Sequence, residues 1–430
     1  MSILIKNAEI LTQNIKREIF QGNIYIEDDK IVEISEKSIN TEADFKLDCN
    51  NKIILPGFIN THTHVPMTLL RGYSDDMILT KWLNESIWPI ESKLNKKSIE
   101  IGTKLGIIEM ISSGTTAFLD MYFFEDIIGK VCQNFGIRGF LGFAMIDSGT
   151  PEYKSNELLN KSEIFIKKWK HNKLITPVIA PHSVYTCGPD YLEKTKEISD
   201  KYDILMHTHC SETRNEIYDV SNKYGLRPLG QLAKYGLLNS NMILAHCGWI
   251  TKNEVFDIKK HKSSVVHCPI SNMKIGTGGY APIPEMLESN ISVCLGTDGA
   301  ASNNNLDMIN TMKFCALIHK QHRWNPEVLP AQTVLDFSTI NPAISLKKED
   351  KLGSIEIGKK ADIIIIDFKK PHLVPYHNYV SNIIYSANGN DVDTTIIDGI
   401  PIMLEKEFMT INTEKILEEA EICAKNLTSN

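Results

Sequence analysis

The stretch Pro56-Gly57-Phe58-Ile59-Asn60-Thr61-His62-Thr63-His64 decides the fold, because it carries two histidines at the end of a predicted strand. The apolar residues Ile53-Ile54-Leu55 lead into it, and alternate residues of a strand share one face, so His62 and His64 point the same way. Two imidazoles on one face can bind one cation, and a catalytic zinc site typically has about three protein ligands and one position for water. A histidine pair of this kind also fits a core or a solvent-facing strand, so the other ligands must come from elsewhere.

Three later stretches combine a short apolar run with a side chain that can bind a metal or transfer a proton. They are Leu205-Met206-His207-Thr208-His209, Leu244-Ala245-His246 and Leu295-Gly296-Thr297-Asp298-Gly299. Strand alternation puts His207 on the same face as His209, so we expect it to lie beside the site. We predict that these stretches meet the first histidine pair around one cation.

The composition is that of a globular protein: of 430 residues, 42% are hydrophobic and 23% are charged. The net charge of -7 argues against nucleic acid as a partner, because phosphate binding needs a clustered excess of Lys and Arg. Nine cysteines without a Cys-x-x-Cys pair indicate reduced thiols. The N-terminus lacks the pattern of a signal peptide, and no apolar run approaches the roughly 20 residues that span a membrane. We therefore expect a cytoplasmic protein that has no membrane partner, and the sequence leaves open whether it forms a homo-oligomer.

Short strands separated by turns occupy both ends of the chain. Residues 1–55 contain patterns such as Lys30-Ile31-Val32-Glu33-Ile34, and residues 346–411 repeat them, for example at Ile363-Ile364-Ile365-Ile366. Neither part has enough strands to close a core, which predicts one small β-sandwich domain built from both. Residues 412–430 are predicted to form a C-terminal helix, which packs through Ile416, Leu417, Ala420 and Ile422.

Between these ends, residues 56–345 alternate strand-like and helix-like stretches. Eight such units over about 250 residues or more are typical of a (β/α)8 TIM barrel, in which the chemistry lies at the C-terminal ends of the strands. All the candidate ligands fall at such ends, and the predicted fold class is therefore α/β. The predicted strands are 54–62, 115–121, 139–146, 174–181, 204–209, 242–246, 264–267 and 292–297, with helix-period apolar positions at 98–111, 155–169, 189–201 and 305–319.

With these motifs the chain resembles the amidohydrolase superfamily, and within it the 5-methylthioadenosine/S-adenosylhomocysteine deaminase family. The similarity spans essentially the whole chain, including the split sandwich. It implies hydrolytic deamination of adenosine-type nucleosides, such as 5'-methylthioadenosine, S-adenosylhomocysteine, adenosine or 5'-deoxyadenosine, to the inosine analogue and ammonia. The resemblance rests on Asn60-Thr61-His62-Thr63-His64 through Leu69-Leu70-Arg71-Gly72, Trp88-Pro89-Ile90-Glu91, His209-Cys210-Ser211-Glu212-Thr213 and Gly296-Thr297-Asp298-Gly299-Ala300-Ala301-Ser302-Asn303-Asn304.

The same resemblance implies one divalent metal per subunit, held by His62, His64, His209 and Asp298. This set of nitrogen and oxygen ligands suits Zn²⁺ best, and Fe²⁺ or Ni²⁺ could also occupy it. An ion in such a site lowers the pKa of a bound water from about 15.7 toward about 7. The sequence therefore predicts a water-activating metal centre.

Three residues are expected to handle protons. By the resemblance, Glu212 moves a proton from the water to the purine N1, His246 orients the attacking oxygen, and Asp298 takes a proton as the tetrahedral intermediate collapses. A positioned acid–base group is typically worth about a hundredfold to ten-thousandfold in rate. By itself Glu212 would fit a solvated loop, but its place three residues after a metal histidine favours the catalytic interpretation.

Other residues are expected to bind the nucleoside. The resemblance implies that the Glu91 carboxylate accepts hydrogen bonds from the ribose diol. It also implies that His182 contacts the purine and the sugar, and that Glu212 faces the substrate. Met67, Trp82 and Trp88 are candidates for an apolar wall, although each fits an ordinary core as well.

The resemblance weakens where family members bind the carboxylate of S-adenosylhomocysteine with two arginines. Here Phe143 stands near the first of those positions, and Tyr153 or Lys154 stands near the second. Arginine binds a carboxylate through two parallel hydrogen bonds and lysine only as a point charge. We therefore expect nucleosides with an uncharged 5' group to be turned over better than S-adenosylhomocysteine.

Three other functions remain open at this stage. A related amidohydrolase could deaminate or dechlorinate another heterocycle, such as guanine, cytosine or a triazine, although Glu91 and His182 favour a nucleoside. A two-metal amide hydrolase such as a dihydroorotase would need a bridging lysine at the end of the fourth strand, and residues 176–182 contain none. A non-catalytic scaffold on the same fold would lose ligands, whereas this chain keeps them all.

Overall fold

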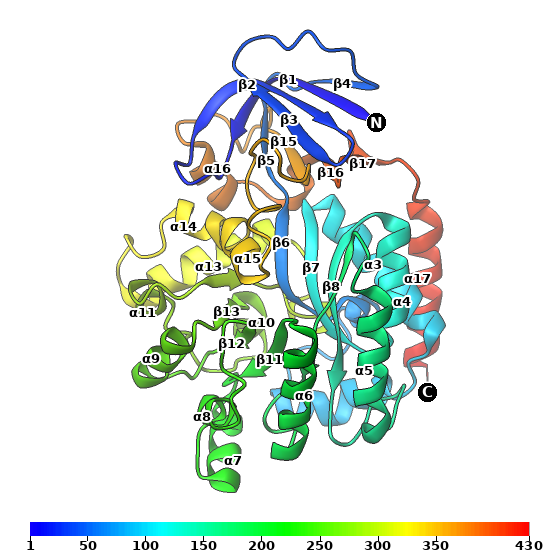
Figure 1. The fold of residues 1–430 in the computed structure, drawn as a ribbon, viewed down its shortest axis with the longest axis vertical. Helices are drawn as coiled ribbons and strands as arrows, with labels where there is room; N and C mark the ends of the chain where they lie inside the picture. Colours follow the sequence, from blue (N-terminus) through cyan, green and yellow to red (C-terminus); the bar gives the residue numbers. More distant parts are fainter. Residues whose placement is uncertain (430) are drawn as a thin grey trace.

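The computed structural model describes residues 1–429, and both ends of the chain join one nine-stranded sheet above a barrel (Figure 1). The strands run in the order β18-β17-β16-β15-β5-β1-β2-β3, and β4 pairs with β1. The predicted composite β domain built from both ends is confirmed, and its strands form one sheet in which β4 branches from β1. They are β1 (Ser2–Leu11), β2 (Ile19–Glu27), β3 (Lys30–Ser35), β4 (Phe45–Asp48), β5 (Lys52–Pro56), β15 (Ile363–Asp367), β16 (Val392–Ile397), β17 (Ile400–Leu404) and β18 (Glu407–Phe408).

Both faces of this sheet are buried at its central strands β5 and β15, where consecutive apolar residues point to opposite sides. On β5, Ile54 packs with Ile363 and Ile365 in a core that belongs to the small sheet alone. The neighbouring residues Ile53 and Leu55 point the other way and join the large core of the barrel. The consecutive apolar residues of these strands therefore pack alternately into the core of the small sheet and into the core of the barrel.

The barrel closes through eight strand positions. β9 and β10 both pair with β8 and form one broken position, while backbone bridges at Ile179 and Ser183 join this part to β11. At the other seam, the amide of Asp298 donates to the carbonyl of His62 at 2.9 Å. The strands are β6 (Phe58–Thr63), β7 (Thr115–Tyr122), β8 (Arg138–Met145), β9 (Ile175–Pro177), β10 (Ala180–Pro181), β11 (Met206–Cys210), β12 (Met242–His246), β13 (Ser264–His267) and β14 (Val293–Leu295).

The first predicted strand, 54–62, is wrong in one respect, because the structure divides it at Gly57 into β5 and β6. A Cβ on Gly57 would lie 2.2 Å from the side chain of Thr116, so only glycine fits where the chain passes from the small sheet into the barrel. We propose that this point separates the sandwich segment 1–55 from the barrel segment 56–345.

A buried ion pair fastens the small sheet to the bottom of the barrel. Arg138, at the start of β8, donates from Nε and Nη2 to both carboxylate oxygens of Asp362 at 2.9 Å, and from Nη2 to Asp398 at 3.1 Å. The side chains of Arg138 and Asp362 are only 8% and 5% exposed. The guanidinium therefore links the turns next to β15 and β16 to a barrel strand.

Helices cover the outside of the barrel and its C-terminal rim. The loop after β6 contains η1 (Val65–Leu70), α1 (Leu79–Trp82), η2 (Leu83–Ile87) and α2 (Trp88–Glu91). Within residues 1–429, no helix is both long and apolar enough to span a membrane. The remaining helices are α3 (Lys96–Ser112), α4 (Glu125–Phe135), α5 (Ser155–Trp169), α6 (Pro189–Tyr202), α7 (Arg214–Tyr224), α8 (Pro228–Lys234), α9 (Lys252–His261), α10 (Pro269–Lys274), α11 (Ile283–Glu288), α12 (Ala300–Asn303), α13 (Met308–Arg323), α14 (Ala331–Asp336), α15 (Ile340–Ser345), α16 (Tyr379–Tyr385), η3 (Gly389–Asp391) and α17 (Thr413–Thr428).

The C-terminal helix α17 lies against α3 on the outside of the barrel (Figure 1). Ile416 and Ala420 are buried in this contact, as predicted. Leu417 and Ile422 are 54% and 61% exposed, so their predicted place in the contact is wrong. The helix buries a narrower stripe than the sequence suggests, and Leu427 extends that stripe by two turns.

Candidate active site and metal centre

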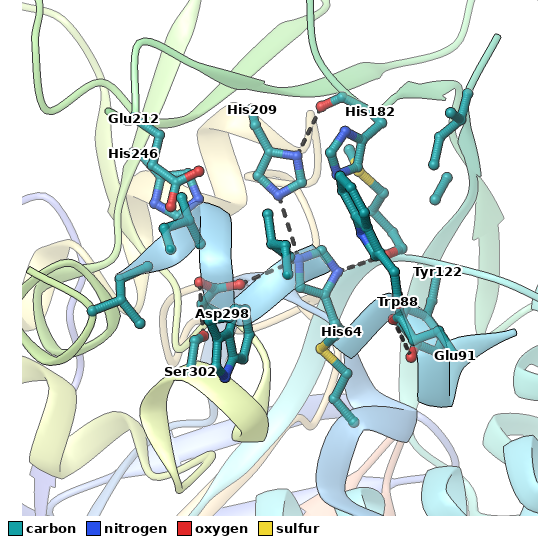
Figure 2. A pocket seen from close by; sticks show the side chains of 18 of the residues that line it. His64, Trp88, Glu91, Tyr122, His182, His209, Glu212, His246, Asp298 and Ser302 are labelled. Atoms are coloured by element: carbon teal, nitrogen blue, oxygen red, sulfur yellow. Dashed lines mark hydrogen bonds and ion pairs between the residues drawn. The ribbon is translucent and has the colours of Figure 1, made fainter. Parts of the chain in front are cut away.

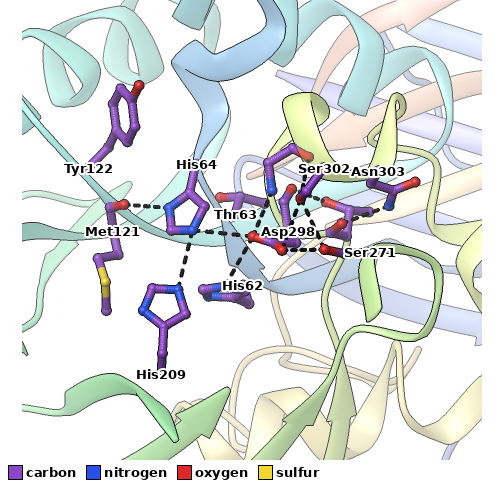
Figure 3. Close-up of polar contacts among 12 residues, drawn as sticks. His62, Thr63, His64, Met121, Tyr122, His209, Ser271, Asp298, Ser302 and Asn303 are labelled. Carbon is purple, nitrogen blue, oxygen red and sulfur yellow. Dashed lines mark hydrogen bonds and ion pairs between the residues drawn. The ribbon is translucent and has the colours of Figure 1, made fainter. Parts of the chain in front are cut away.

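The four predicted metal ligands meet at the C-terminal ends of β6, β11 and β14 (Figure 3). Oδ1 of Asp298 lies 3.4 Å from Nε2 of His62 and 3.2 Å from Nε2 of His64. Nε2 of His209 lies 3.3 Å from Nε2 of His64. Side chains separated by more than 230 residues of sequence thus present their ligand atoms to one point.

The spacing of these atoms fits a metal ion. Bonds of about 2.0–2.1 Å in a tetrahedral zinc site put neighbouring ligand atoms about 3.3 Å apart, close to the three distances above. Nε2 of His62 is fully buried and has no hydrogen-bond partner among residues 1–429. A buried polar atom usually has a partner, and an ion between these side chains would provide one.

Each histidine is oriented through its other ring nitrogen. Nδ1 of His64 lies 2.6 Å from the carbonyl oxygen of Met121, and Nδ1 of His209 lies 2.8 Å from that of His182. Nδ1 of His62 lies 2.7 Å from Nε2 of His207, which explains why a second histidine stands on β11. Partners of this kind fix the tautomer and the orientation of a metal-binding imidazole.

Asp298 is held in place by hydroxyl groups and by a close approach of two backbones. Its Oδ2 accepts hydrogen bonds from Ser271 at 2.6 Å and Ser302 at 3.0 Å (Figure 3). A Cβ on Gly296 would lie 2.6 Å from Cβ of His62, so glycine is required where β14 passes beside β6. Asp298 itself has φ of +64°, a strained conformation that aims its carboxylate at the histidines.

The electrostatics favour neutral rings at His62 and His209 and a protonated ring at His64, beside the carboxylate of Asp298. Burial lowers the pKa of His62 to about 4 and that of His209 well below its ordinary value. Burial also acts on His64, but the hydrogen bond and the charge of Asp298 outweigh it and raise its pKa to about 9. Although burial opposes it, the contact with both histidines lowers the pKa of Asp298 well below its usual range. A divalent ion would displace the proton that His64 and Asp298 share, because its ligands must be deprotonated.

Glu212 and His246 lie together on one side of the pocket above this cluster (Figure 2). Nδ1 of His246 lies 2.9 Å from Oδ1 of Asn272, and its φ of +70° turns the ring toward the histidines. Its ring also lies close enough to His62 and His209 to share an ion with them. Burial raises the pKa of Glu212, so this carboxyl group holds a proton more readily than an exposed glutamate does, as a proton-transfer group needs.

The opposite side of the pocket carries Glu91, Tyr122 and His182 (Figure 2). The hydroxyl of Tyr122 donates to Oε1 of Glu91 at 2.7 Å, and burial raises the pKa of Glu91 to about 7. Nδ1 of His182 lies 2.9 Å from the hydroxyl of Thr186. Met67, Trp82 and Trp88 also line the pocket, as the sequence suggested.

This geometry agrees with the comparisons to known proteins. The sequence profile of the amidohydrolase family matches residues 53–401. The chain belongs to the amidohydrolase family. A 5-methylthioadenosine/S-adenosylhomocysteine deaminase of Thermococcus onnurineus is 43% identical over 410 residues, 95% of each chain. A 5'-deoxyadenosine deaminase of Methanosphaera stadtmanae is 42% identical over 429 residues, 99% of each chain.

Solved structures of other proteins share the fold of this amidohydrolase. An adenosine deaminase from Xanthomonas campestris with bound zinc has a TM-score of 0.96 and 30% identity, and covers 99% of this chain and 98% of its own. An atrazine chlorohydrolase from Arthrobacter aurescens has a TM-score of 0.93 at 21% identity, with 98% and 100% coverage. The resemblance and the barrel with its additional sheet predicted from the sequence are confirmed.

One expectation about this amidohydrolase is wrong. Phe143 was expected to face the 5' end of the nucleoside, but it points outward and packs against Phe165 at 5.3 Å between ring centroids. Alternate residues of β8 face opposite sides, so Ala144, and beyond the strand Ile146, line the pocket instead. The pocket still offers no cation of the arginine or lysine type to a carboxylate, because neither residue occurs among the described residues that line it.

Sequence reasoning missed the residues that orient the predicted ones. Tyr122 is the last residue of β7 and contacts Glu91. The C-terminal end of a barrel strand is where residues of the active site are expected. Ser271 and Asn272 lie on α10, the helix that follows β13, and contact Asp298 and His246. For Tyr122 the position at a strand end is a signal that the sequence offers, whereas Ser271 and Asn272 carry no such signal.

Proposed function

We propose that this amidohydrolase hydrolyses the 6-amino group of adenosine-type nucleosides and releases the inosine analogue and ammonia. The observation that supports this most strongly is the meeting of a His-His-His-Asp cluster with two buried carboxyl groups, Glu212 and Glu91, around one pocket. The first carboxyl group lies beside the cluster and the second lies across the pocket (Figure 2). One end of the pocket is thus built for hydrolysis and the other for a polar group of the substrate.

The metal ligands are His62, His64, His209 and Asp298, and the ion is Zn²⁺, with Fe²⁺ or Ni²⁺ as the alternatives. When bound, a divalent ion supplies a water that loses a proton near neutral pH. The family and the cluster support a divalent metal, and the nitrogen and oxygen ligands suit zinc.

The residues of the chain then move protons around the purine. Glu212 accepts the proton of the attacking water and delivers it to N1, which makes C6 more electrophilic. Asn272 keeps the ring of His246 facing the cluster, where its Nε2 can hydrogen-bond the attacking oxygen. Asp298, fixed by two serine hydroxyls, takes the second proton from the C6 hydroxyl and passes it to the amino group, which leaves as ammonia while the C6 carbonyl forms. The sum of these steps is one water consumed and one ammonia released.

The other side of the pocket binds the ribose. The Glu91 carboxylate offers one oxygen to Tyr122 and keeps acceptor capacity for the two hydroxyls of a diol. His182 lies with its ring centroid 4.7 Å from that of His209, between the metal cluster and the ribose side. Burial lowers the pKa of His182 to about 3, so it meets the nucleoside as a neutral ring.

The preferred substrates carry an uncharged 5' group, such as 5'-methylthioadenosine, 5'-deoxyadenosine or adenosine. Ala144, Ile146 and Tyr185 provide apolar or neutral surface at the edge of the pocket. A buried carboxylate without a cationic partner costs several kcal/mol in a protein interior, so S-adenosylhomocysteine has to keep its amino-acid group in water. This preference rests on the composition of the pocket wall.

Ammonia release from a panel of substrates tests the proposal. Zinc-loaded enzyme should deaminate the three neutral adenosine analogues, with kcat/KM higher than for S-adenosylhomocysteine, and should not act on guanine, cytosine or a chlorinated triazine. Higher kcat/KM for S-adenosylhomocysteine would refute the 5' preference alone. Activity restricted to a free base or a triazine would refute the nucleoside assignment, and inertness toward the whole panel would favour a non-catalytic scaffold.

A further inference from the structure

A second cluster of metal-binding side chains lies in the barrel wall, outside the residues assigned to catalysis. His267 ends β13, and Cys315 and His319 stand one turn apart on the same face of α13. Their three ligand atoms all lie within 4.8 Å of one another, and the two Nε2 atoms are 3.1 Å apart. This spacing of nitrogens is close to the edge of about 3.3 Å in a tetrahedral zinc site.

The cluster is buried and lacks hydrogen bonds for groups that normally have them. His267, Cys315 and His319 are 5%, 0% and 1% exposed. The Nδ1 atoms of both histidines are fully buried and have no hydrogen-bond partner among residues 1–429. Of the four ring nitrogens, only the two Nε2 atoms make a polar contact, and that contact is with each other. The two Nδ1 atoms are therefore an exception to the rule that buried polar groups have hydrogen-bond partners.

The donor set is selective in its chemistry. Two imidazoles and one thiol suit Zn²⁺ and related borderline ions, and they do not suit Mg²⁺ or Ca²⁺, which prefer oxygen ligands. A cavity of about 220 Å³ borders both histidines and is rimmed by Gly276, Gly278 and Gly279. It has room for a water as the fourth ligand and offers a route for the ion.

We propose that His267, Cys315 and His319 bind a second divalent metal ion of the zinc class, with a water from the adjoining cavity as fourth ligand. The thiol loses its proton to solvent when the ion binds, as metal-bound cysteines do. Both imidazoles bind as neutral rings. The complex carries one positive charge, from two on the ion and one negative charge on the thiolate.

This site has a structural consequence that differs from catalysis. An ion there would tie α13 to the end of β13, which is followed at once by α10 with Ser271 and Asn272. These two residues hold Asp298 and His246, so the second ion would stiffen the wall behind the catalytic residues. It would also raise the metal content above the one ion per subunit that the family resemblance implies.

Cobalt substitution of the full-length enzyme tests the proposal with a signal that the catalytic site cannot give. The catalytic ligands are nitrogen and oxygen atoms only, whereas the second site adds a thiolate, which gives Co²⁺ an intense charge-transfer band in the near ultraviolet. Titration of metal-free enzyme should bind two equivalents of Co²⁺ and develop this band. The Cys315→Ser variant should bind one equivalent, lack the band and retain deaminase activity.

Two further variants control the experiment. His319→Gln should also lower the stoichiometry from two to one and abolish the band, and it carries the test if Cys315→Ser does not fold. Cys423→Ser changes a half-buried cysteine on the distant helix α17 and should leave the band intact. One equivalent without a thiolate band in the unaltered enzyme overturns the proposal, as does a band that persists in folded Cys315→Ser or His319→Gln enzyme.

Discussion

Replacement of Glu212 by Gln should separate proton transfer from metal binding. The side chain is buried above the cluster but is not among the four ligands, and glutamine keeps its shape while removing the ionisable group. A positioned acid–base group contributes about a hundredfold to ten-thousandfold in rate. At 1.36 kcal/mol per tenfold, this equals about 2.7–5.4 kcal/mol in the activation barrier. We expect kcat to fall within that range and the zinc content to stay the same.

Steady-state ammonia release, metal analysis and a pH profile of kcat/KM check this expectation together. Because burial raises the pKa of Glu212, the carboxylate is present above that pKa and activity in the unaltered enzyme is lost as the pH falls through it. The Gln variant should lose this acidic limb as well as rate. A variant with less than a tenfold loss of kcat and an unchanged acidic limb would refute the role of Glu212, and loss of zinc would assign it to the metal site instead.

Three further changes probe the ribose side, the 5' end and the link between the two sheets. Burial raises the pKa of Glu91 to about 7, so affinity for the inosine product should weaken as the pH falls below 7, and Glu91→Gln should remove that dependence without loss of zinc. Ile146→Arg should raise kcat/KM for S-adenosylhomocysteine relative to 5'-methylthioadenosine about tenfold, because a charge-assisted hydrogen bond is worth about 1.5–3 kcal/mol; an unchanged ratio would place the 5' group elsewhere. Arg138→Met should lower the free energy of unfolding in urea by about 3–5 kcal/mol, because it leaves Asp362 buried and unpaired, and a loss below 1 kcal/mol would contradict this.

The sequence predicts that the candidate metal ligands lie close together, because strand alternation is a local rule and the barrel brings all C-terminal strand ends to one rim. His62, His209 and Asp298 could be placed from that rule alone. The division of the first strand at Gly57 was not predictable in this way. It depends on contact with Thr116, about sixty residues later in the chain, and apolar residues continue on both sides of the break.

Errors arise where a residue has to be assigned to the inner or the outer face of a strand or helix and no neighbouring residue fixes that choice. Its distance from the strand end predicts that Phe143 faces the pocket, but a shift of one residue along the strand puts its side chain on the outside of the barrel. On α17, a rotation of the helix by about a third of a turn decides whether Leu417 is buried, and the pattern of apolar residues fits either orientation. The orienting contacts of His207 and Asn272 depend on atoms from other strands, so they emerge only in three dimensions.

Each ligand is oriented by an element other than its own, which makes the site a property of the closed barrel. The seam between β6 and β14 is the critical joint, since the amide of Asp298 donates to the carbonyl of His62 there. In Gly296→Ala, a methyl group would lie 2.6 Å from Cβ of His62, so the two strands must separate and carry Asp298 away from the histidines. We expect this variant to lose zinc and activity together while circular dichroism still shows a folded protein. Gly230→Ala is the matched control, because its nearest neighbour would be 3.5 Å away, and it should keep both. Full zinc content in Gly296→Ala would show that the ligands assemble without this seam.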